Sequence, residues 1–172
     1  MGKRSNFKHR KNDTYDTPYK AFLPLIPHLV PGATYTEPCA GKGFLIDHLM
    51  FHGFQISAAY DINPRVHNVQ KKDAMGLQKF DVKHSDYIIT NPPWTRQLLH
   101  PMIEVFRSIT TTWLLLDADW KHTKQAIPYM EYCSLVVNIG RVSWEENGVS
   151  GKDNCCWYRF GKDKAETIFK TR

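Results

Sequence analysis

Apolar residues recur along the chain with two different periods, and these periods predict alternating helices and strands. Helical spacing predicts helices over Pro18–Leu29, from Phe44 to about His52, and over Gln97–Ser108. Short apolar or alternating runs predict strands at Tyr35–Glu37, Gln55–Tyr60, around Val69, at Tyr87–Thr90 and at Trp113–Leu116. Strands that alternate with helices in this way are typical of a mostly parallel sheet.

The C-terminal part of the chain has a different pattern. Two apolar runs, Leu135–Ile139 and Cys156–Phe160, flank a polar, glycine-bearing stretch from Glu145 to Asn154. We expect these runs to form an antiparallel hairpin with a long loop at the sheet edge. The run Trp113–Leu116 is apolar throughout, as expected for a central strand that is buried on both faces.

Length and charge suggest one domain with a polyanionic partner. A chain of 172 residues has room for one hydrophobic core, here residues 15–172, after a basic arm at residues 1–14. The formal net charge of +6 favours binding to phosphates. Cations crowd the arm before its first acid, Asp13: Lys3, Arg4, Lys8, Arg10 and Lys11. The arm either contacts nucleic acid or serves as a solubilising tail.

The same composition indicates the compartment. No apolar run approaches the ~20 residues that span a bilayer, and the polar N-terminus lacks the apolar segment of a signal peptide. We therefore expect a cytoplasmic protein without a membrane partner. No Cys-x-x-Cys pair is present, so we expect reduced, packed thiols and no metal site. The cysteines are Cys39, Cys133, Cys155 and Cys156, the last two being neighbours that should face opposite sides of a strand.

The first candidate site is the tetrapeptide Asn91-Pro92-Pro93-Trp94, which directly follows the strand Tyr87–Thr90. Open α/β sheets bind their ligands at this carboxyl edge. There, the Asn91 side-chain oxygen and the Pro92 carbonyl can accept hydrogen bonds from a planar exocyclic amine whose ring lies on Trp94. This arrangement suits methylation of a nucleobase amine. The alternative is a strand that ends in a double-proline turn over a buried tryptophan.

The second candidate site is the turn Glu37–Gly43, where Gly41 and Gly43 allow a ligand to approach the backbone. The residues after Lys42 do not fit a P-loop, which excludes that type of ATPase. Asp61 lies 20 positions after Gly41, at a strand end where acids accept hydrogen bonds from ribose hydroxyls, and Asp73 repeats this placement one strand later. A dinucleotide site would explain these residues but not the tetrapeptide, whereas an adenosyl cofactor with a reactive methyl group explains both.

With these motifs, the chain from about Tyr15 to Phe160 resembles class I S-adenosylmethionine-dependent methyltransferases. Within them it is most similar to small phage or prophage enzymes that make N6-methyladenine in DNA. The resemblance implies a Rossmann-like three-layer α/β/α sandwich with a mostly parallel sheet and a C-terminal antiparallel hairpin. It also implies S-adenosylmethionine as cofactor, DNA as partner and, for a phage-encoded enzyme, the host cytoplasm. The chain departs from many members because no segment is long enough for a separate target-recognition domain, which puts strict site specificity in doubt.

The resemblance assigns roles to single residues. Asn91, Pro92, Pro93 and Trp94 are similar to the catalytic tetrapeptide. The implied cofactor-binding residues are Tyr15, Thr17 and Pro18 for the methionine part, Glu37, Pro38, Cys39, Ala40, Gly41 and Gly43 in the glycine-rich loop, Asp61 and Ile62 at the ribose, Asp73 and Ala74 at the adenine, and Asn91.

A nucleic-acid surface is expected beside the tetrapeptide. The segment Asp119–Lys124 follows the strand Trp113–Leu116 at the same sheet edge and mixes an aromatic side chain with cations. It is either a loop that contacts substrate or a helix start with a solvated face. The candidate nucleic-acid contacts are Lys8, Arg10, Lys11, Trp120, Lys121, Lys124 and Lys152.

The expected reaction requires no catalytic histidine, because the amine can lose its proton after methyl transfer. In duplex DNA the base must leave the stack, which single-stranded substrate would avoid. Related tetrapeptide enzymes methylate amines in RNA or a glutamine amide in proteins, and the basic arm argues against a protein substrate. A non-catalytic module that binds cofactor or DNA is the other alternative, against which the intact tetrapeptide argues. The sequence leaves the oligomeric state open.

Overall fold

Strands and helices alternate along the chain in the computed structural model, which describes residues 15–144 and 153–171. The strands are β1 (Thr34–Glu37), β2 (Gln55–Asp61), β3 (Gln70–Lys71), β4 (Tyr87–Thr90), β5 (Thr111–Asp117), β6 (Cys133–Arg141), β7 (Asn154–Phe160) and β8 (Ile168–Lys170). The α-helices are α1 (Tyr19–Phe22), α2 (Phe44–Phe51), α3 (Arg96–Ile109) and α4 (Ile127–Met130). Short 3-10 helices lie at Leu23–His28, Ala74–Gly76, Lys79–Val82, Trp120–His122 and Lys124–Ala126.

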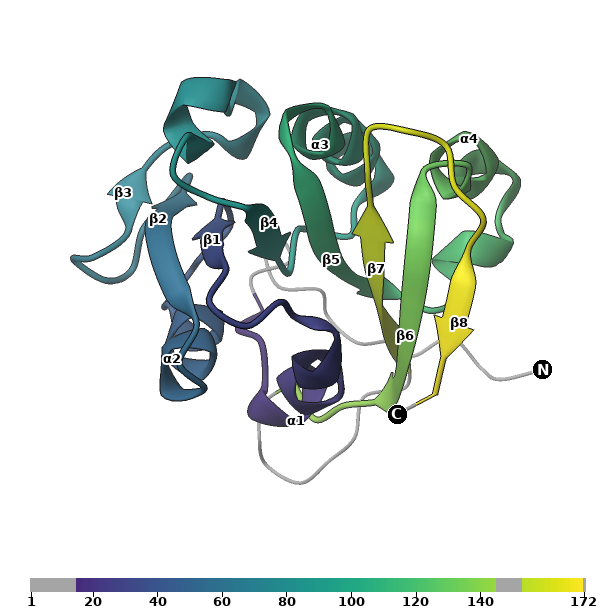
Figure 1. Cartoon of the computed structure of the whole chain (residues 1–172), viewed down its shortest axis with the longest axis horizontal. Coiled ribbons are helices and arrows are strands. Elements are labelled where there is room, and N and C mark those ends of the chain that lie inside the picture. The colour runs from purple at the N-terminus through teal and green to yellow at the C-terminus, as the bar shows by residue number, and fades with distance from the viewer. Residues whose placement is uncertain (1–14, 145–152, 172) are drawn as a thin grey trace.

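The described strands form one eight-stranded sheet in the order β3-β2-β1-β4-β5-β7-β6-β8 (Figure 1). Among them, β7 alone runs antiparallel to its neighbours, β5 and β6. The predicted mostly parallel sheet and the antiparallel pairing of β6 with β7 are both confirmed. The hairpin is not at the sheet edge, however, because β7 lies between β5 and β6, and β8 pairs with the outer side of β6. The exposed, three-residue β8 has no alternating pattern that would have predicted it.

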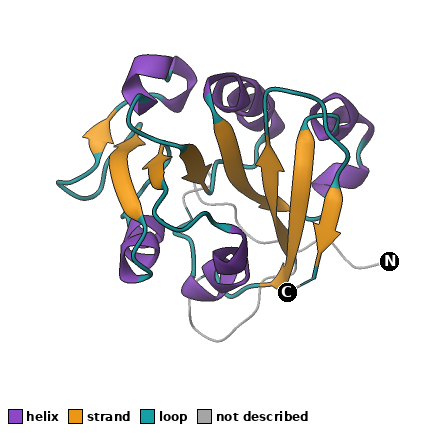
Figure 2. Ribbon diagram, in the orientation of Figure 1, coloured by secondary structure: helices purple, strands orange, loops and turns teal. Residues whose placement is uncertain are grey.

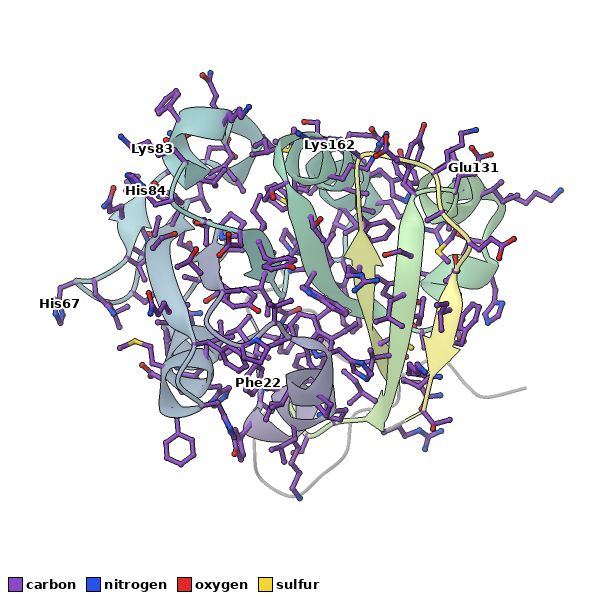
Figure 3. The ribbon with its side chains drawn as sticks, in the orientation of Figure 1. Phe22, His67, Lys83, His84, Glu131 and Lys162 are labelled. Carbon is purple, nitrogen blue, oxygen red and sulfur yellow. The ribbon has the colours of Figure 1, made fainter. Side chains whose placement is uncertain are left out.

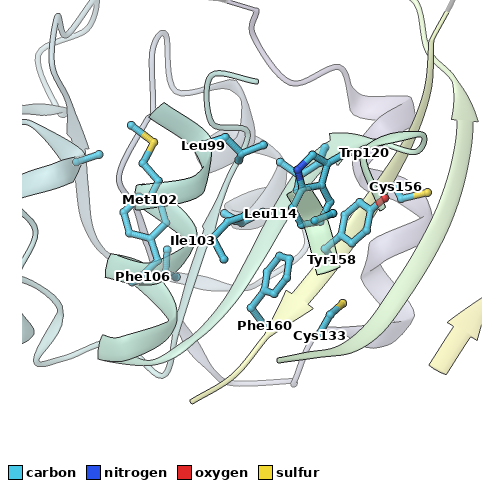
Figure 4. Close-up of a cluster of buried hydrophobic side chains, with 14 of the residues drawn as sticks. Leu99, Met102, Ile103, Phe106, Leu114, Trp120, Cys133, Cys156, Tyr158 and Phe160 are labelled. Atoms are coloured by element: carbon cyan, nitrogen blue, oxygen red, sulfur yellow. The ribbon is translucent and has the colours of Figure 1, made fainter. Parts of the chain in front are cut away.

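Each face of the sheet carries its own apolar core, because alternate residues of a strand point to opposite faces. On one face, Leu114 and Leu116 of β5 pack with Tyr158 of β7 and with the buried side of α3 (Figure 4). On the other face, Trp113 and Leu115 of β5 pack with residues of α1, the following 3-10 helix and α2. The layers of helix, sheet and helix are those of an α/β/α sandwich (Figure 2).

The predicted helix over Pro18–Leu29 is only partly α-helical. α1 ends at Phe22, and the chain continues as a 3-10 helix over Leu23–His28. Pro24 and Pro27 cannot donate the backbone hydrogen bonds of an α-helix, which explains the change. The apolar side of this segment still reaches the core, where Phe22 is fully buried against one face of the sheet. Charged side chains elsewhere, such as Lys83, Glu131 and Lys162, are exposed on the surface (Figure 3).

Among the described residues, no helix is long and apolar enough to cross a membrane. No group of three or more His, Cys, Asp or Glu side chains in this part of the chain is arranged to hold a metal ion. Cys155 and Cys156 are free thiols that face opposite cores, as the strand period predicts. The basic arm and most of the loop between β6 and β7 lie outside the described residues.

Candidate active site

The carboxyl ends of adjacent parallel strands bring the two sequence motifs together. β1 ends at Glu37 and leads into the glycine turn, and β4, its direct neighbour in the sheet, ends at Thr90 immediately before Asn91. β2, on the other side of β1, ends at Asp61. Residues separated by more than 50 positions in the sequence therefore share one edge of the sheet, where the strand order changes direction from β1 to β4.

Asn91 is held by the segment that precedes α1. Its side-chain nitrogen Nδ2 donates a hydrogen bond to the Tyr15 carbonyl at 3.0 Å. Since Nδ2 faces that carbonyl, the amide orientation is fixed and the side-chain oxygen Oδ1 is the group that remains to accept a hydrogen bond. Asn91 is half-buried. Pro92 is buried beside it and makes the turn rigid.

Trp94 is anchored to the sheet rather than exposed on a loop. Its indole Nε1 donates to the Leu115 carbonyl of β5 at 3.0 Å. Trp144, beyond the end of β6, meets the Trp94 ring edge to face with centroids 5.5 Å apart, and the Tyr15 ring lies 5.9 Å from Trp144. The result is an aromatic cluster of Tyr15, Trp94 and Trp144 next to Asn91. Trp144 was not predicted, because it lies outside the predicted strands and has no motif around it.

Glu37 is a buried carboxylate without a full set of partners. Its side chain is 2 % exposed, and its oxygen Oε2 has no hydrogen-bond partner within the described part of the chain. Burial raises the pKa of Glu37 well above its usual value, and the negative charges of Asp61, Asp16 and Asp47 raise it further. A buried, unpartnered oxygen in a negative environment is suited to receive a donor or a cation from a ligand.

The glycine turn is closed by Asp61. The Gly41 backbone nitrogen donates to Asp61 Oδ2 at 2.8 Å, and the Asn63 nitrogen donates to Oδ1 at 2.7 Å. Each carboxylate oxygen thus holds one backbone donor and keeps further acceptor capacity for a ligand. Gly41 and Gly43 have positive φ angles of 54° and 82°, which a glycine adopts without strain. The turn is therefore fixed to the end of β2, and neither glycine places a side chain of its own there.

A charged group that sequence reasoning missed lies directly over this turn. Arg65 Nη2 donates to Asp16 Oδ1 at 2.7 Å, and Lys42 Nζ lies 3.4 Å from Asp16 Oδ2. A Cβ atom on Gly41 would lie only 2.5 Å from Arg65 Nη2. Arg65 and Asp16 are 49 positions apart and neither belongs to a motif, so no local signal could have predicted the pair.

The other predicted cofactor residues lie around the same edge. Thr17 and Pro18 are buried, and the Thr17 carbonyl accepts a hydrogen bond from His48 Nε2 on α2 at 3.0 Å. Asp73 Oδ1 accepts from the Met75 nitrogen at 2.9 Å and caps the 3-10 helix that begins at Ala74. Pro38 and Ala40 are buried in the turn, Cys39 is half-buried there, and Ile62 is exposed after β2. Burial raises the pKa of the Cys39 thiol, which is therefore protonated at neutral pH and a poor nucleophile.

Of the predicted nucleic-acid residues, the structure describes Trp120, Lys121 and Lys124. Trp120 is only 5 % exposed, packs edge to face against Tyr158, and donates from Nε1 to His100 at 3.1 Å, so its ring faces offer little surface to a base. Lys121 Nζ donates to the Ala118 carbonyl at 2.7 Å, whereas Lys124 is exposed. Lys8, Arg10, Lys11 and Lys152 lie outside the described residues. An unpredicted cation, Arg96, is exposed just after the tetrapeptide, where its Nη1 donates to Gln125 Oε1 at 2.6 Å.

Comparisons with known proteins support the fold. No protein-family model matches the sequence, and no curated protein sequence matches it significantly. Solved structures do match. A Pyrococcus horikoshii protein provisionally assigned as an RNA methyltransferase aligns with a TM-score of 0.65 and 15% identity over 95% of this chain and 94% of its own. A dimethyladenosine transferase from Plasmodium falciparum aligns with a TM-score of 0.54 and 13% identity over 85% of this chain and 61% of its own.

A third similar structure comes from Vibrio vulnificus and is provisionally assigned as the modification subunit of a type I restriction enzyme. It aligns with a TM-score of 0.54 and 11% identity over 91% of this chain. The present chain spans only 46% of that protein but nearly all of the Pyrococcus protein. At these identities the likeness establishes the fold, which is the Rossmann-like fold of class I S-adenosylmethionine-dependent methyltransferases.

Proposed function

We propose that the protein is an S-adenosylmethionine-dependent methyltransferase that modifies the N6 amine of adenine in DNA. One observation carries the proposal: the Tyr15 carbonyl holds the Asn91 amide so that Oδ1 accepts, at the sheet edge that also holds the glycine turn. On a methyltransferase fold, an amide oxygen and the following proline carbonyl form a receptor for an exocyclic amine. The half-buried Trp94 provides an aromatic surface beside it.

The residues around the glycine turn fit the cofactor. Gly41 has no side chain at the centre of the turn, and Asp61 has acceptor capacity left for ribose hydroxyls. The unpartnered oxygen of Glu37 suits the ammonium group at the amino-acid end of the ligand, since a positive charge there relieves the repulsion from neighbouring acids. When bound, S-adenosylmethionine would supply an electrophilic methyl group on a sulfonium.

The tetrapeptide accounts for activation of the acceptor amine. The lone pair of adenine N6 is delocalised into the ring, so the amine needs activation before it can attack a methyl group. Asn91 Oδ1 and the Pro92 carbonyl would each accept one N6 hydrogen and favour a pyramidal nitrogen with its lone pair directed at the methyl donor. Because the Tyr15 carbonyl fixes Asn91 beforehand, the receptor needs little reorganisation during the reaction. The proton leaves after methyl transfer, when the nitrogen has become acidic.

RNA is the second candidate substrate. The Pyrococcus protein, provisionally assigned as an RNA methyltransferase, is matched over nearly the full length of both chains. The tetrapeptide itself does not separate DNA from RNA, because the receptor reads only the amine. The preference for DNA rests on the resemblance of the motifs to those of small DNA adenine methyltransferases. The basic N-terminal arm favours either nucleic acid over a protein substrate.

The test is a methyl-transfer assay with both nucleic acids. Purified protein is incubated with methyl-labelled S-adenosylmethionine and unmethylated DNA or RNA, and the digested nucleosides are analysed by mass spectrometry. We expect N6-methyldeoxyadenosine from DNA, and Asn91→Ala should lower its rate of formation by about 10²- to 10³-fold while cofactor binding persists. Asn138→Ala is the matched control, because Asn138 Nδ2 also donates to a carbonyl, that of Lys170 on β8, far from the tetrapeptide in the sheet order.

Product on RNA alone would replace DNA with the second candidate. Cofactor binding without transfer to either nucleic acid would favour the non-catalytic alternative.

A further inference from the structure

We propose that Arg65 binds the carboxylate at the amino-acid end of the cofactor, exchanging its present partner Asp16 for that ligand. The inference rests on the proposed function and adds to it a residue that no sequence motif identifies. The Arg65 guanidinium occupies the space that Gly41 leaves open. A Cβ atom added to Gly41 would lie 2.5 Å from Arg65 Nη2 and 3.3 Å from Asp16 Oδ1.

Arg65 is anchored to the cofactor turn through its backbone as well. Its nitrogen donates to the Gly41 carbonyl at 3.3 Å. The base of the side chain is thus fixed beside the turn, whether or not the guanidinium is paired with Asp16. A change of partner therefore requires only rotation of a flexible side chain and no movement of the main chain.

The guanidinium has unused capacity for an anion. Of its five N–H donors, the structure engages one, at Nη2, with Asp16 among the residues that it describes. The side chain is 30% exposed, so solvent and ligands can reach it. A guanidinium presents its donors as a planar fork that matches the two oxygens of a carboxylate, and such bidentate pairs are stronger than single hydrogen bonds.

The electrostatics of the turn require a cation for this ligand. Burial raises the pKa of Glu37, and the charges of Asp61, Asp16 and Asp47 raise it further. These three acids would also repel a carboxylate. Arg65 lies directly over Gly41 and offsets that repulsion at the turn. Its departure would leave Asp16 still paired, because Lys42 Nζ lies 3.4 Å from the other Asp16 oxygen. The exchange therefore leaves Asp16 with a counter-charge.

Calorimetry with two ligands tests the assignment. S-adenosylmethionine and its decarboxylated form share the sulfonium, the amine and the nucleoside, and differ in the carboxylate. We expect Arg65→Gln to weaken binding of S-adenosylmethionine about 10- to 100-fold, the range for a lost charge-assisted pair, and to leave the decarboxylated ligand nearly unaffected. Arg65→Lys should weaken S-adenosylmethionine binding less. Lys162→Gln is the control, because it removes one positive charge after β7, beside the start of β5 and away from its carboxyl end.

Three results would overturn the assignment. Equal weakening of both ligands would mean that Arg65 supports the turn without reading the carboxylate. Tighter binding of both by Arg65→Gln would mean that the pair with Asp16 acts as a barrier. Failure of the unsubstituted protein to bind either ligand would instead reject the proposed function, and this inference with it. Thermal denaturation shows whether Arg65→Gln is folded; if it is not, the selectivity of Arg65→Lys between the two ligands decides.

Discussion

The two halves of the sheet differ in how completely their buried polar groups are hydrogen-bonded. In the half formed by β5, β7 and β6, buried polar atoms are paired: Trp157 Nε1 donates to the Ala21 carbonyl at 2.8 Å and the Tyr158 hydroxyl to that of Asp117 at 3.2 Å. In the half that contains β1 and β2, Glu37 is buried with an oxygen unpartnered. Proteins usually satisfy buried polar groups, and exceptions tend to mark places that serve a ligand. The paired polar groups of the first half favour stability, and the unpartnered oxygen of Glu37 lies in the half that is proposed to bind a ligand.

The largest expected effect comes from a substitution in the half formed by β5, β7 and β6. Trp157 is fully buried in β7 and also bonds to the segment around α1. Trp157→Ala leaves a large cavity and an unpaired carbonyl, and should lower the free energy of unfolding by about 3–5 kcal/mol in urea denaturation. Trp157→Phe keeps most of the packing and should cost clearly less. An equal cost for both would show that the hydrogen bond, not the packing, dominates.

A smaller effect of opposite sign is expected from Glu37→Gln. Burial and neighbouring acids raise the pKa of Glu37, so the native state holds this proton more tightly than the unfolded state. The associated stability is present below the usual glutamate pKa and is lost as the pH rises through the raised pKa. The neutral glutamine should therefore raise the melting temperature at pH 7 by ~2–4 °C, with the gain vanishing at acidic pH.

The same variant should weaken cofactor binding, since glutamine cannot supply the carboxylate that is proposed to meet the ammonium group of the ligand. Stability and binding would then change in opposite directions at one residue. Glu166→Gln, at an exposed position, is the matched control and should change neither. A lower melting temperature of Glu37→Gln at neutral pH would show that the Glu37 carboxylate is fully hydrogen-bonded, like the buried polar groups of β5, β7 and β6.

The smallest effect is expected at Trp94, which joins the two halves. Trp94→Phe removes the hydrogen bond from Nε1 to the Leu115 carbonyl but keeps an aromatic ring, and should cost about 1 kcal/mol of stability. Methyl transfer should fall only modestly, and much less than in Trp94→Ala. Denaturation curves and initial rates measured on both variants check this order. Equal loss of activity in both would show that the anchoring bond, and not the aromatic surface, matters.

Strands could be predicted from the sequence where neighbouring residues alone produce the apolar pattern. β5 reads as a central strand because it is apolar throughout, and the alternation in Cys155, Cys156 and Trp157 assigns each side chain to a face. The place of β7 between β5 and β6 was not predictable, since a hydrophobic strand fits equally well at either side of its hairpin partner. β8 is short and exposed, so it carries no periodic signal at all.

The candidate site was predictable where its residues are contiguous in sequence. The turn Glu37–Gly43 and the tetrapeptide at Asn91 are such motifs, and the strand order places them on one edge. The contacts that hold them are long-range: Tyr15 meets Asn91 across 76 positions, and Asp16 meets Arg65 across 49. No pattern within a window of sequence encodes these pairs. The roles of the residues remain predictions for the experiments above.

The inserted strand β7 also affects how the chain can assemble during its synthesis. β5 and β6 are not hydrogen-bonded to each other, since β7 occupies the place between them and pairs with both. A nascent chain that has emerged from the ribosome only as far as β6 therefore exposes two open strand edges with nothing to join them. Until residues 154–160 arrive, both edges are open to pairing with other chains. The sheet thus cannot be joined until β7 has been made, and translation stalled before it should yield an aggregation-prone species.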